Sequence, residues 1–133
     1  MELEEKISPQ KILYKEECFA IQGAVFEVYR ELGHGFLESV YQECLSREFV
    51  SRGILFVSQP DMPIVYKGEL TGLTFRPDFV CFDKVLLELK SVKETNAEHR
   101  AQVINYLKVS GFRLGLLINF GNHPRATVER IIL

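Results

Sequence analysis

The sequence lacks several features that would assign it to a class at once. Its 133 residues carry a net charge of −2 at a pI near 5.9, so there is no overall basic character of the kind seen in generic DNA-binding domains. No hydrophobic signal region follows Met1, and the apolar run at residues 114–118 is far too short to span a bilayer. We therefore expect no membrane partner and no secretory leader.

Paired and clustered cysteines are also missing. Cys18, Cys44 and Cys81 are odd in number, widely spaced and set among apolar residues, and they form no Cys-x-x-Cys motif. This pattern indicates reduced core thiols in a cytoplasmic protein. No repeat, linker or low-complexity segment divides the chain. With 47% hydrophobic and 26% charged residues, we expect a polar lead-in at residues 1–13 and a single domain at residues 14–133.

Charge is unevenly distributed along the chain. Residues 1–50 contain ten acidic and five basic side chains, whereas residues 51–133 contain eight acidic and eleven basic ones. Two acids of the second half, Asp78 and Glu88, belong to the candidate site described below. With a cation bound there, the second half would be clearly positive.

Three helices are predicted from the sequence, two of them in the N-terminal part of the chain. Apolar residues recur at spacings of three and four from Tyr14 to Leu32, which predicts an amphipathic helix of roughly five turns. A second helix is expected from about Phe36 to Arg52, closed by Gly53. A third is expected to follow residues 95–98, Thr-Asn-Ala-Glu, which have the form of a capping box, and to end near residue 110.

Strands are predicted between and after these helices. Short apolar runs bounded by turn residues place them at residues 54–58, 62–67, 74–82, 85–91, 113–120 and 127–132. The run at 113–120 is rich in Val, Ile and Leu, which suggests burial on both faces. The chain order predicts an α/β fold with a mixed central sheet flanked by helices.

The two strands at residues 74–82 and 85–91 carry the strongest chemical signal. Glu88 and Lys90 share one face of their strand, because residues i and i+2 point the same way. If Asp78 faces them across the turn at Asp83-Lys84, two carboxylates and one ammonium converge. Two carboxylates can bind a hard divalent cation, and a nearby lysine can orient or activate a metal-bound water. The alternatives are an ion pair of Lys90 with Glu88 or Asp78, or an exposed sheet face.

Three motifs in this order resemble the PD-(D/E)xK nuclease superfamily and, within it, the small GxxExxY proteins. Residues 35–41, Gly-Phe-Leu-Glu-Ser-Val-Tyr, match the motif that names the second group. Residues 76–78, Arg-Pro-Asp, followed by residues 88–90, Glu-Leu-Lys, match the nuclease signature. Residues 101–108 and 115–121 resemble a helix that carries a glutamine and the strand after it. The resemblance covers roughly residues 14–121 and implies a restriction-endonuclease-like core.

The resemblance also implies roles for individual residues. Asp78, Glu88 and the backbone carbonyl of Leu89 would bind the metal, Mg²⁺ with Mn²⁺ as a substitute. Lys90 would position the attacking water and stabilise charge on the phosphate. Glu38 would complete the site through metal or water, unless it is only a carboxylate at a helix N-terminus.

The remaining candidates surround this centre. Gln102 would abut the site, as the corresponding glutamine does in the family, and together with Glu38, Asp78, Glu88 and Lys90 it makes up the expected catalytic set. Substrate contacts are expected from Tyr41, Arg76, Lys93, His99 and Tyr106, with core packing or solvated surface as the alternatives. His34 and His123 look like turn residues, and no histidine spacing suggests a zinc site.

These residues predict a metal-dependent nuclease that hydrolyses phosphodiester bonds by a metal-activated water, with DNA as the favoured substrate. The alternative is a catalytically silent module of the same fold that binds nucleic acid or a partner protein, which the acidic pI favours. A chain this short shows no separate recognition domain. Selectivity would then come from nucleic-acid shape, a homodimer or a protein partner.

Overall fold

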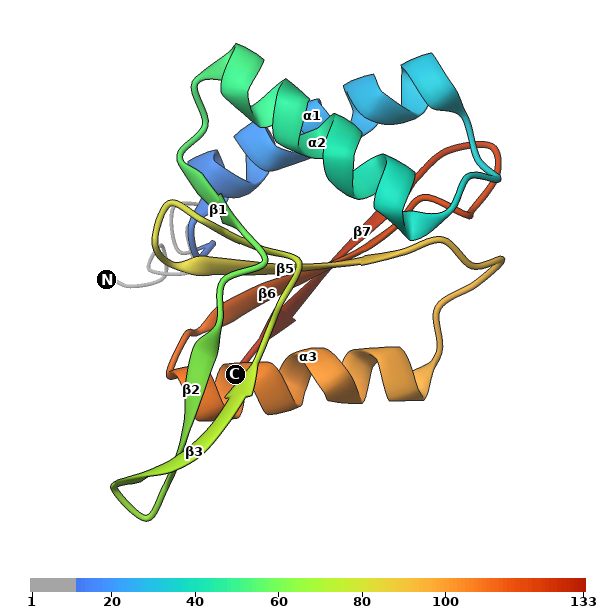
Figure 1. The fold of residues 1–133 in the computed structure, drawn as a ribbon. Helices are drawn as coiled ribbons and strands as arrows, with labels where there is room; N and C mark the ends of the chain where they lie inside the picture. Colours follow the sequence, from blue (N-terminus) through green and yellow to red (C-terminus); the bar gives the residue numbers. More distant parts are fainter. Residues whose placement is uncertain (1–11) are drawn as a thin grey trace, which may run out of the picture.

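The computed structural model describes residues 12–133, so the lead-in expected at residues 1–13 lies almost entirely outside the described residues. The chain forms three helices and seven strands in the described part (Figure 1). In chain order they are α1 (Lys15–Leu32), α2 (Glu38–Arg52), β1 (Phe56–Ser58), β2 (Met62–Tyr66), β3 (Glu69–Phe75), β4 (Phe79–Cys81), β5 (Val85–Lys90), α3 (Ala97–Ser110), β6 (Leu114–Asn119) and β7 (Thr127–Ile132).

A five-stranded sheet lies between two helical layers. Its strand order is β1-β4-β5-β6-β7, and the β5–β6 pair is parallel while the other pairs are antiparallel. Helices α1 and α2 cover one face, and α3 covers the other (Figure 1). The parallel pair requires a crossover, which α3 supplies between β5 and β6. The expected α/β fold with a mixed sheet flanked by helices is confirmed.

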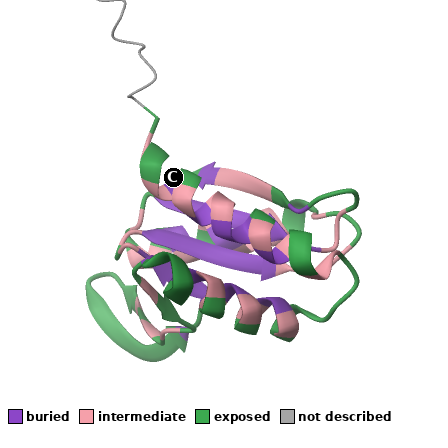
Figure 2. Cartoon of the chain, turned by 90° about the horizontal axis from the view of Figure 1, so that it is seen from above, coloured by how far each residue is buried: buried purple, intermediate pink, exposed green. Residues whose placement is uncertain are grey.

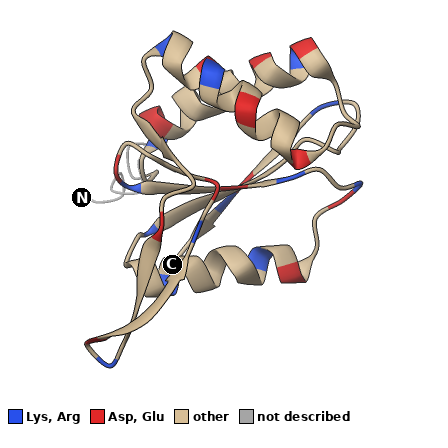
Figure 3. Cartoon of the chain, in the orientation of Figure 1, with Lys and Arg blue, Asp and Glu red and all other residues tan. Residues whose placement is uncertain are grey.

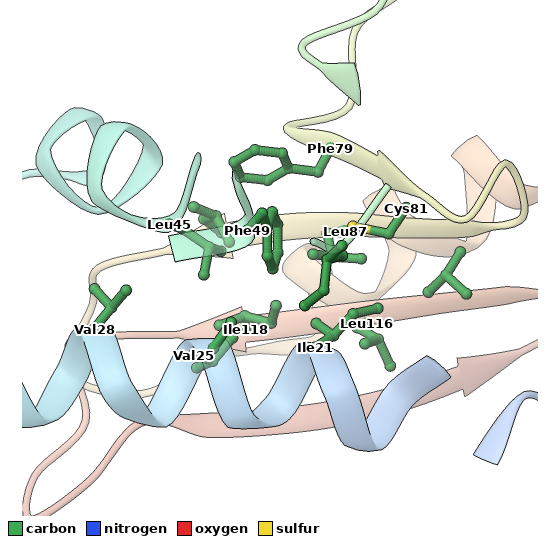
Figure 4. Close-up of a cluster of buried hydrophobic side chains, with 14 of the residues drawn as sticks. Ile21, Val25, Val28, Leu45, Phe49, Phe79, Cys81, Leu87, Leu116 and Ile118 are labelled. Carbon is green, nitrogen blue, oxygen red and sulfur yellow. The ribbon is translucent and has the colours of Figure 1, made fainter. Parts of the chain in front are cut away.

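Side chains of β5 point alternately to the two faces of the sheet and so contribute to two hydrophobic cores. Leu87 and Leu89 pack against the α1–α2 layer in the larger core, whereas Leu86 faces Val103 and Leu107 of α3. Figure 4 shows the larger core, to which α1 contributes Ile21, Val25 and Val28, α2 contributes Leu45 and Phe49, and the sheet contributes Phe79, Cys81, Leu87, Leu116 and Ile118. Strand β6 is buried along its whole length, as its composition predicted.

The cysteines fit this core. Cys18 and Cys81 are buried, Cys44 is partly buried, and all three are free. Burial raises the pKa of the Cys81 thiol to about 12, so this side chain is protonated at neutral pH. None of the helices within residues 12–133 has the length and apolar character needed to cross a membrane.

The prediction of a single strand at residues 74–82 is wrong. Its two ends belong to different sheets, since β3 pairs with β2 in a separate two-stranded sheet and β4 pairs with β1 and β5. Pro77 explains the break, because proline cannot donate a ladder hydrogen bond. β3 starts at Glu69, earlier than expected, directly after a turn at Lys67-Gly68 whose φ angles are 51° and 82°. Asp78 therefore lies in the loop directly before β4 and not on a strand.

Strands β2 and β3 form an arm that extends from the body of the molecule (Figure 1). Most of the arm is exposed, as the green hairpin in Figure 2 shows. Its base is anchored on α3, where the rings of Phe75 and Tyr106 stack with centroids 4.7 Å apart. The arm therefore rests against the helix that carries Gln102 and Tyr106.

Two helix starts also differ from expectation. Helix α2 begins at Glu38, two residues after the expected Phe36. The box expected from Thr95 and Glu98 is formed one residue later, by Asn96 and His99. The Asn96 side chain accepts from the His99 N–H at 3.0 Å, and His99 Nδ1 accepts from the Asn96 N–H at 3.2 Å. Asparagine is a strong N-cap, and a histidine at N3 can accept a hydrogen bond from the N-cap backbone N–H, as the glutamate of a capping box does.

Candidate active site

Asp78, in the loop just before β4 begins, lies beside Glu88 of β5. The last backbone pair between these strands is Phe79 with Leu87. Beyond this pair, carboxylate side chains replace the backbone carbonyls as hydrogen-bond acceptors. The Asp78 N–H donates to Glu88 Oε1 at 3.0 Å, and the Leu89 N–H donates to Asp78 Oδ2 at 2.7 Å. The hairpin geometry expected from the sequence thus brings the two carboxyl groups together, although Asp78 reaches this place from a loop.

Helix α2 also holds Asp78 in position. Gln42 Nε2 donates to the Asp78 carbonyl at 2.9 Å, and the Gln59 N–H donates to the same oxygen at 2.9 Å. Gln42 follows Glu38 by one helical turn, so the two side chains share a face of α2. Sequence reasoning missed Gln42. Its i+4 spacing from Glu38 is the signal that could have identified it.

The electrostatics of the pair are those of two carboxyl groups withdrawn from water. Glu88 is only 5% exposed, and this burial, reinforced by the negative charge of Asp78, raises its pKa to about 8. The pKa of Asp78 is also raised, first by burial and further by the charge of Glu38, despite the bond from Leu89. Without a cation, the folded protein therefore holds an acidic pair that resists ionisation.

This environment fits a divalent cation. Residues 12–133 contain no group of three or more His, Cys, Asp or Glu side chains positioned to hold a metal. Mg²⁺, however, usually keeps several waters and needs only one or two protein carboxylates. Asp78 and Glu88 provide two that lie close together and have no cationic partner in their hydrogen bonds, Glu88 buried and Asp78 partly buried. The N–H and C=O of a strand residue point to the same side, so the Leu89 carbonyl points toward the edge where its N–H meets Asp78.

Lys90 begins a short chain of polar side chains on the α3 side of β5. Its Nζ donates to Gln102 Oε1 at 3.1 Å, and Gln102 Nε2 donates to the Tyr106 hydroxyl at 3.0 Å. Lys90 forms no ion pair with a carboxylate of the described residues, so the alternative of a structural Lys90–Glu88 or Lys90–Asp78 pair is not realised. Burial and, to a lesser extent, the negative charge of Glu88 raise the pKa of Tyr106.

Glu38 approaches from the opposite layer, as the first residue of α2. Its charge raises the pKa of both Asp78 and Glu88, so it lies within electrostatic reach of both. Tyr41, one turn later, is completely buried, and its ring stacks on Phe120 at 4.3 Å. The Tyr41 hydroxyl donates to the Gly33 carbonyl at 2.5 Å and accepts from the Phe36 N–H at 3.3 Å. This arrangement favours an ordering role for Tyr41 over a phosphate contact.

A cleft of about 1290 Å³ opens at Glu38. Its lining comes from the turn before α2 and from the segments that follow β5 and β6, including His34, Phe36, Glu38, Lys93 and His123. The carboxyl ends of two parallel strands thus meet the N-terminus of α2 at one edge of the sheet. Ligands of open α/β sheets commonly bind at such an edge.

Asn119 is a second residue that sequence reasoning missed. This buried side chain accepts from the Val92 N–H at 3.1 Å and the Gly121 N–H at 2.9 Å, and donates to the Val92 carbonyl at 2.9 Å. It therefore ties the segment after β5 to the segment after β6 and shapes the cleft wall. A polar residue at the end of an otherwise apolar strand was the available signal.

Arg76 and His99 have other partners in the structure. Arg76 pairs with Asp61 at 2.9 Å in an exposed salt bridge, and His99 Nδ1 is engaged in the N-terminal cap of α3. The rings of His34 and His123, far apart in sequence, lie 4.8 Å from each other at the cleft. Lys93 is exposed and lines the same cleft as Glu38.

Comparisons with known proteins concern the family and the fold of the chain. The family model described as the PD-(D/E)XK nuclease superfamily matches residues 15–131. No curated protein sequence matches the chain significantly. Among solved structures, an alkaline exonuclease (LHK-Exo) from Laribacter hongkongensis is similar with a TM-score of 0.52 at 12% identity. The match covers 71% of this chain but only 55% of the exonuclease. The protein SSO0001 matches with a TM-score of 0.49 at 15% identity, over 86% of this chain and 76% of its own.

Proposed function

Because the chain belongs to the PD-(D/E)XK nuclease superfamily, we propose that it is a metal-dependent nuclease that hydrolyses phosphodiester bonds in nucleic acid, with DNA as the favoured substrate. One observation carries this proposal. The buried carboxyl group of Glu88 and the partly buried one of Asp78 are each held by a backbone N–H of the other's segment, and Lys90 projects from the same face as Glu88. A purely structural role for two such acids without a cationic partner would be costly.

Each residue of this centre would have a distinct task. Asp78, Glu88 and the Leu89 carbonyl would hold a divalent cation, Mg²⁺ or Mn²⁺, which when bound supplies Lewis-acid polarisation of the phosphate and of an attacking water. Lys90, oriented by Gln102, would hold that water and offset negative charge as it develops on the phosphate. Glu38 would bind a further water from the opposite wall, and Lys93 would contact the phosphate backbone from the cleft.

We also infer membership of the GxxExxY group within the superfamily. The motif at residues 35–41 supports this, since the charge of its glutamate raises the pKa of Asp78 and its tyrosine hydroxyl holds the turn before α2. A cytoplasmic location is supported by the three free thiols, two of them buried. A homodimer or protein partner would contribute to substrate recognition.

The rival proposal is a catalytically silent module that binds nucleic acid or protein. The net charge of −2 favours it, and α2 carries both acidic and basic positions in Figure 3 without one basic face. The presence of both carboxyl groups and of Lys90 on neighbouring segments argues for the enzyme. The two proposals differ in a measurable way, because only the enzyme converts substrate.

The test is cleavage of a panel of supercoiled plasmid, linear duplex, single-stranded and branched DNA, and RNA, with Mg²⁺ or Mn²⁺. Glu88→Gln keeps the acceptor for the Asp78 N–H but removes the charge, and should lower the rate by about a hundredfold or more. Glu43→Gln, an exposed acid on α2, is the matched control and should cleave as wild type does. Absence of cleavage by folded wild-type protein on every substrate would overturn the enzyme and leave the binding module.

A further inference from the structure

Phe36 is an exposed aromatic residue in the cleft that opens at Glu38. It lines the same cleft as Glu38, two residues before it, and 45% of its surface remains exposed. Isolated apolar residues on a protein surface need no explanation. Phe36 differs from such residues because it lies inside the cleft and because its backbone is held on both sides.

The hydrogen bonds that hold Phe36 come from two different parts of the fold. The Phe36 N–H donates to the buried Tyr41 hydroxyl at 3.3 Å, and the Phe36 carbonyl accepts from Ser91 Oγ, just beyond β5, at 2.5 Å. Its ring meets the Tyr41 ring edge-on, with centroids 6.1 Å apart at 80°. Tyr41 is itself stacked on Phe120 in the core. The phenyl group is therefore fixed in place while part of its surface stays open to the cleft.

The surroundings of Phe36 suit a nucleotide strand. Lys93 places one positive charge in the same cleft, whose lining also includes the acids Glu38 and Glu94, and the paired rings of His34 and His123 extend its aromatic lining. A basic group that follows the backbone together with an aromatic face that stacks on a base is the combination by which proteins bind single-stranded nucleic acid. In a duplex the base faces are already stacked on each other, so an aromatic ring reaches one at the lowest energetic cost where the strand is unpaired.

We propose that Phe36 stacks on an unpaired base next to the phosphate held at the carboxylate centre, so that the preferred substrate is a single strand or an unpaired end. This proposal rests on the proposed nuclease function and adds its substrate class. The ring would position the strand in the cleft without taking part in the chemistry, and its contribution would appear in binding of unpaired strands.

Three variants test this proposal. Phe36→Tyr keeps the aromatic face, whereas Phe36→Leu keeps apolar bulk and removes that face. Phe19→Leu is the matched control, because Phe19 is a 77% exposed phenylalanine on α1 outside this cleft. Thermal unfolding of each variant shows whether folding is intact. The probes are a single-stranded oligodeoxynucleotide with 2-aminopurine at positions along its length and the matching duplex, with Ca²⁺ replacing Mg²⁺ to allow binding without cleavage.

Stacking should quench the 2-aminopurine fluorescence of the single strand with wild-type protein, Phe36→Tyr and Phe19→Leu. Phe36→Leu should lose the quenching and bind the single strand on the order of tenfold more weakly, with duplex binding unchanged. If wild-type protein binds and cleaves nucleic acid while Phe36→Leu quenches and binds equally well, the stacking role is overturned and the nuclease stands. If wild-type protein neither binds nor cleaves any nucleic acid, the proposed function fails, and the stacking role fails with it.

Discussion

The backbone N–H of Asp78 donates to Glu88 Oε1 at 3.0 Å, at the point where the ladder between β4 and β5 would otherwise continue. The reciprocal bond from Leu89 N–H to the Asp78 carboxylate, at 2.7 Å, completes the replacement of a strand pair by side chains. Each carboxyl group is thereby fixed by a backbone group of the opposite segment. The two carboxylates are therefore already in position for a cation, and the protein need not rearrange when the cation binds.

Glu88→Gln should separate function from stability. The amide oxygen can still accept from the Asp78 N–H, while the buried negative charge is removed. In the presence of a chelator at about pH 9, above the raised pKa of Glu88, we expect the variant to unfold at a higher urea concentration than wild type. Cleavage should be lost at the same time. A variant that is both inactive and less stable under these conditions would show that the charge of Glu88 is compensated within the protein.

The raised pKa of Glu88 also predicts how stability depends on pH in the chelated protein. A carboxyl group with a pKa of about 8 when folded and 4.5 as its model value binds more protons in the folded state between these limits. Stability should therefore be greatest below about pH 5 with respect to this group, and fall as pH rises toward about 8, by on the order of a few kcal/mol. The raised pKa of Asp78 acts in the same direction.

Thermal unfolding between about pH 5 and about pH 9 checks this prediction. Excess Mg²⁺ should reduce the loss at high pH, because a cation binds the ionised carboxylates. Glu88→Gln should flatten the profile of the chelated protein. An identical profile for wild type and variant would contradict the assignment of the shift to Glu88.

Local patterns predicted the helices and the site better than they predicted the strands. The 3.6-residue period located α1 and α2 within a few residues, and the i, i+2 rule placed Glu88 and Lys90 on one face. The strand expected at residues 74–82 failed because its apolar run crosses Pro77 into a second sheet. Whether two adjacent runs share a sheet depends on long-range pairing, which a short window of sequence does not contain.

The same limit explains which site residues were missed. Gln42 and Asn119 act on backbone groups that are distant in sequence, at Asp78 and at Val92 with Gly121. A motif identifies groups that would touch metal or substrate, but it does not identify those that hold loops in place. The role of Tyr41 depends in the same way on a turn that folds back over it.

Gln102 is predicted to act through Lys90. Gln102→Ala removes the acceptor 3.1 Å from Lys90 Nζ, so the ammonium should become mobile and kcat should fall about tenfold, with little change in KM or in the unfolding midpoint. Tyr106→Phe removes only the hydroxyl that accepts from Gln102, and should cost several times less. Steady-state kinetics on the cleaved substrate measures both. A loss for Tyr106→Phe as large as that for Gln102→Ala would instead indicate that the Tyr106 hydroxyl contacts substrate.

Tyr41→Phe should weaken the turn that delivers Phe36 and Glu38. The substitution keeps the stacked ring but leaves the Gly33 carbonyl and the Phe36 N–H without their shared partner. The free energy of unfolding should fall by about 1–3 kcal/mol. Urea denaturation measures this loss, with Tyr66→Phe on the exposed arm as the control expected to remain near wild type. An unchanged stability for Tyr41→Phe would mean that water replaces the hydroxyl.

Gly121→Ala and Gly23→Ala should have opposite effects, although the chemical change is the same. A Cβ on Gly121 would overlap the backbone N and carbonyl O of Val92, so the two segments tied by Asn119 would have to separate. At Gly23, within α1, the nearest atom is the end of the flexible Arg52 side chain at 3.0 Å, which can move aside. Alanine favours a helix interior over glycine by roughly 0.5–1 kcal/mol.

We therefore expect Gly23→Ala to unfold at a slightly higher urea concentration than wild type. Gly121→Ala should be destabilised by about 1–3 kcal/mol, as is typical of overpacking. Because Gly121 lines the cleft, its variant should also lose cleavage activity even at temperatures where it remains folded, whereas Gly23→Ala should keep it. If Gly121→Ala were as stable and active as wild type, the close contact of the segments after β5 and β6 would not be needed to shape the cleft.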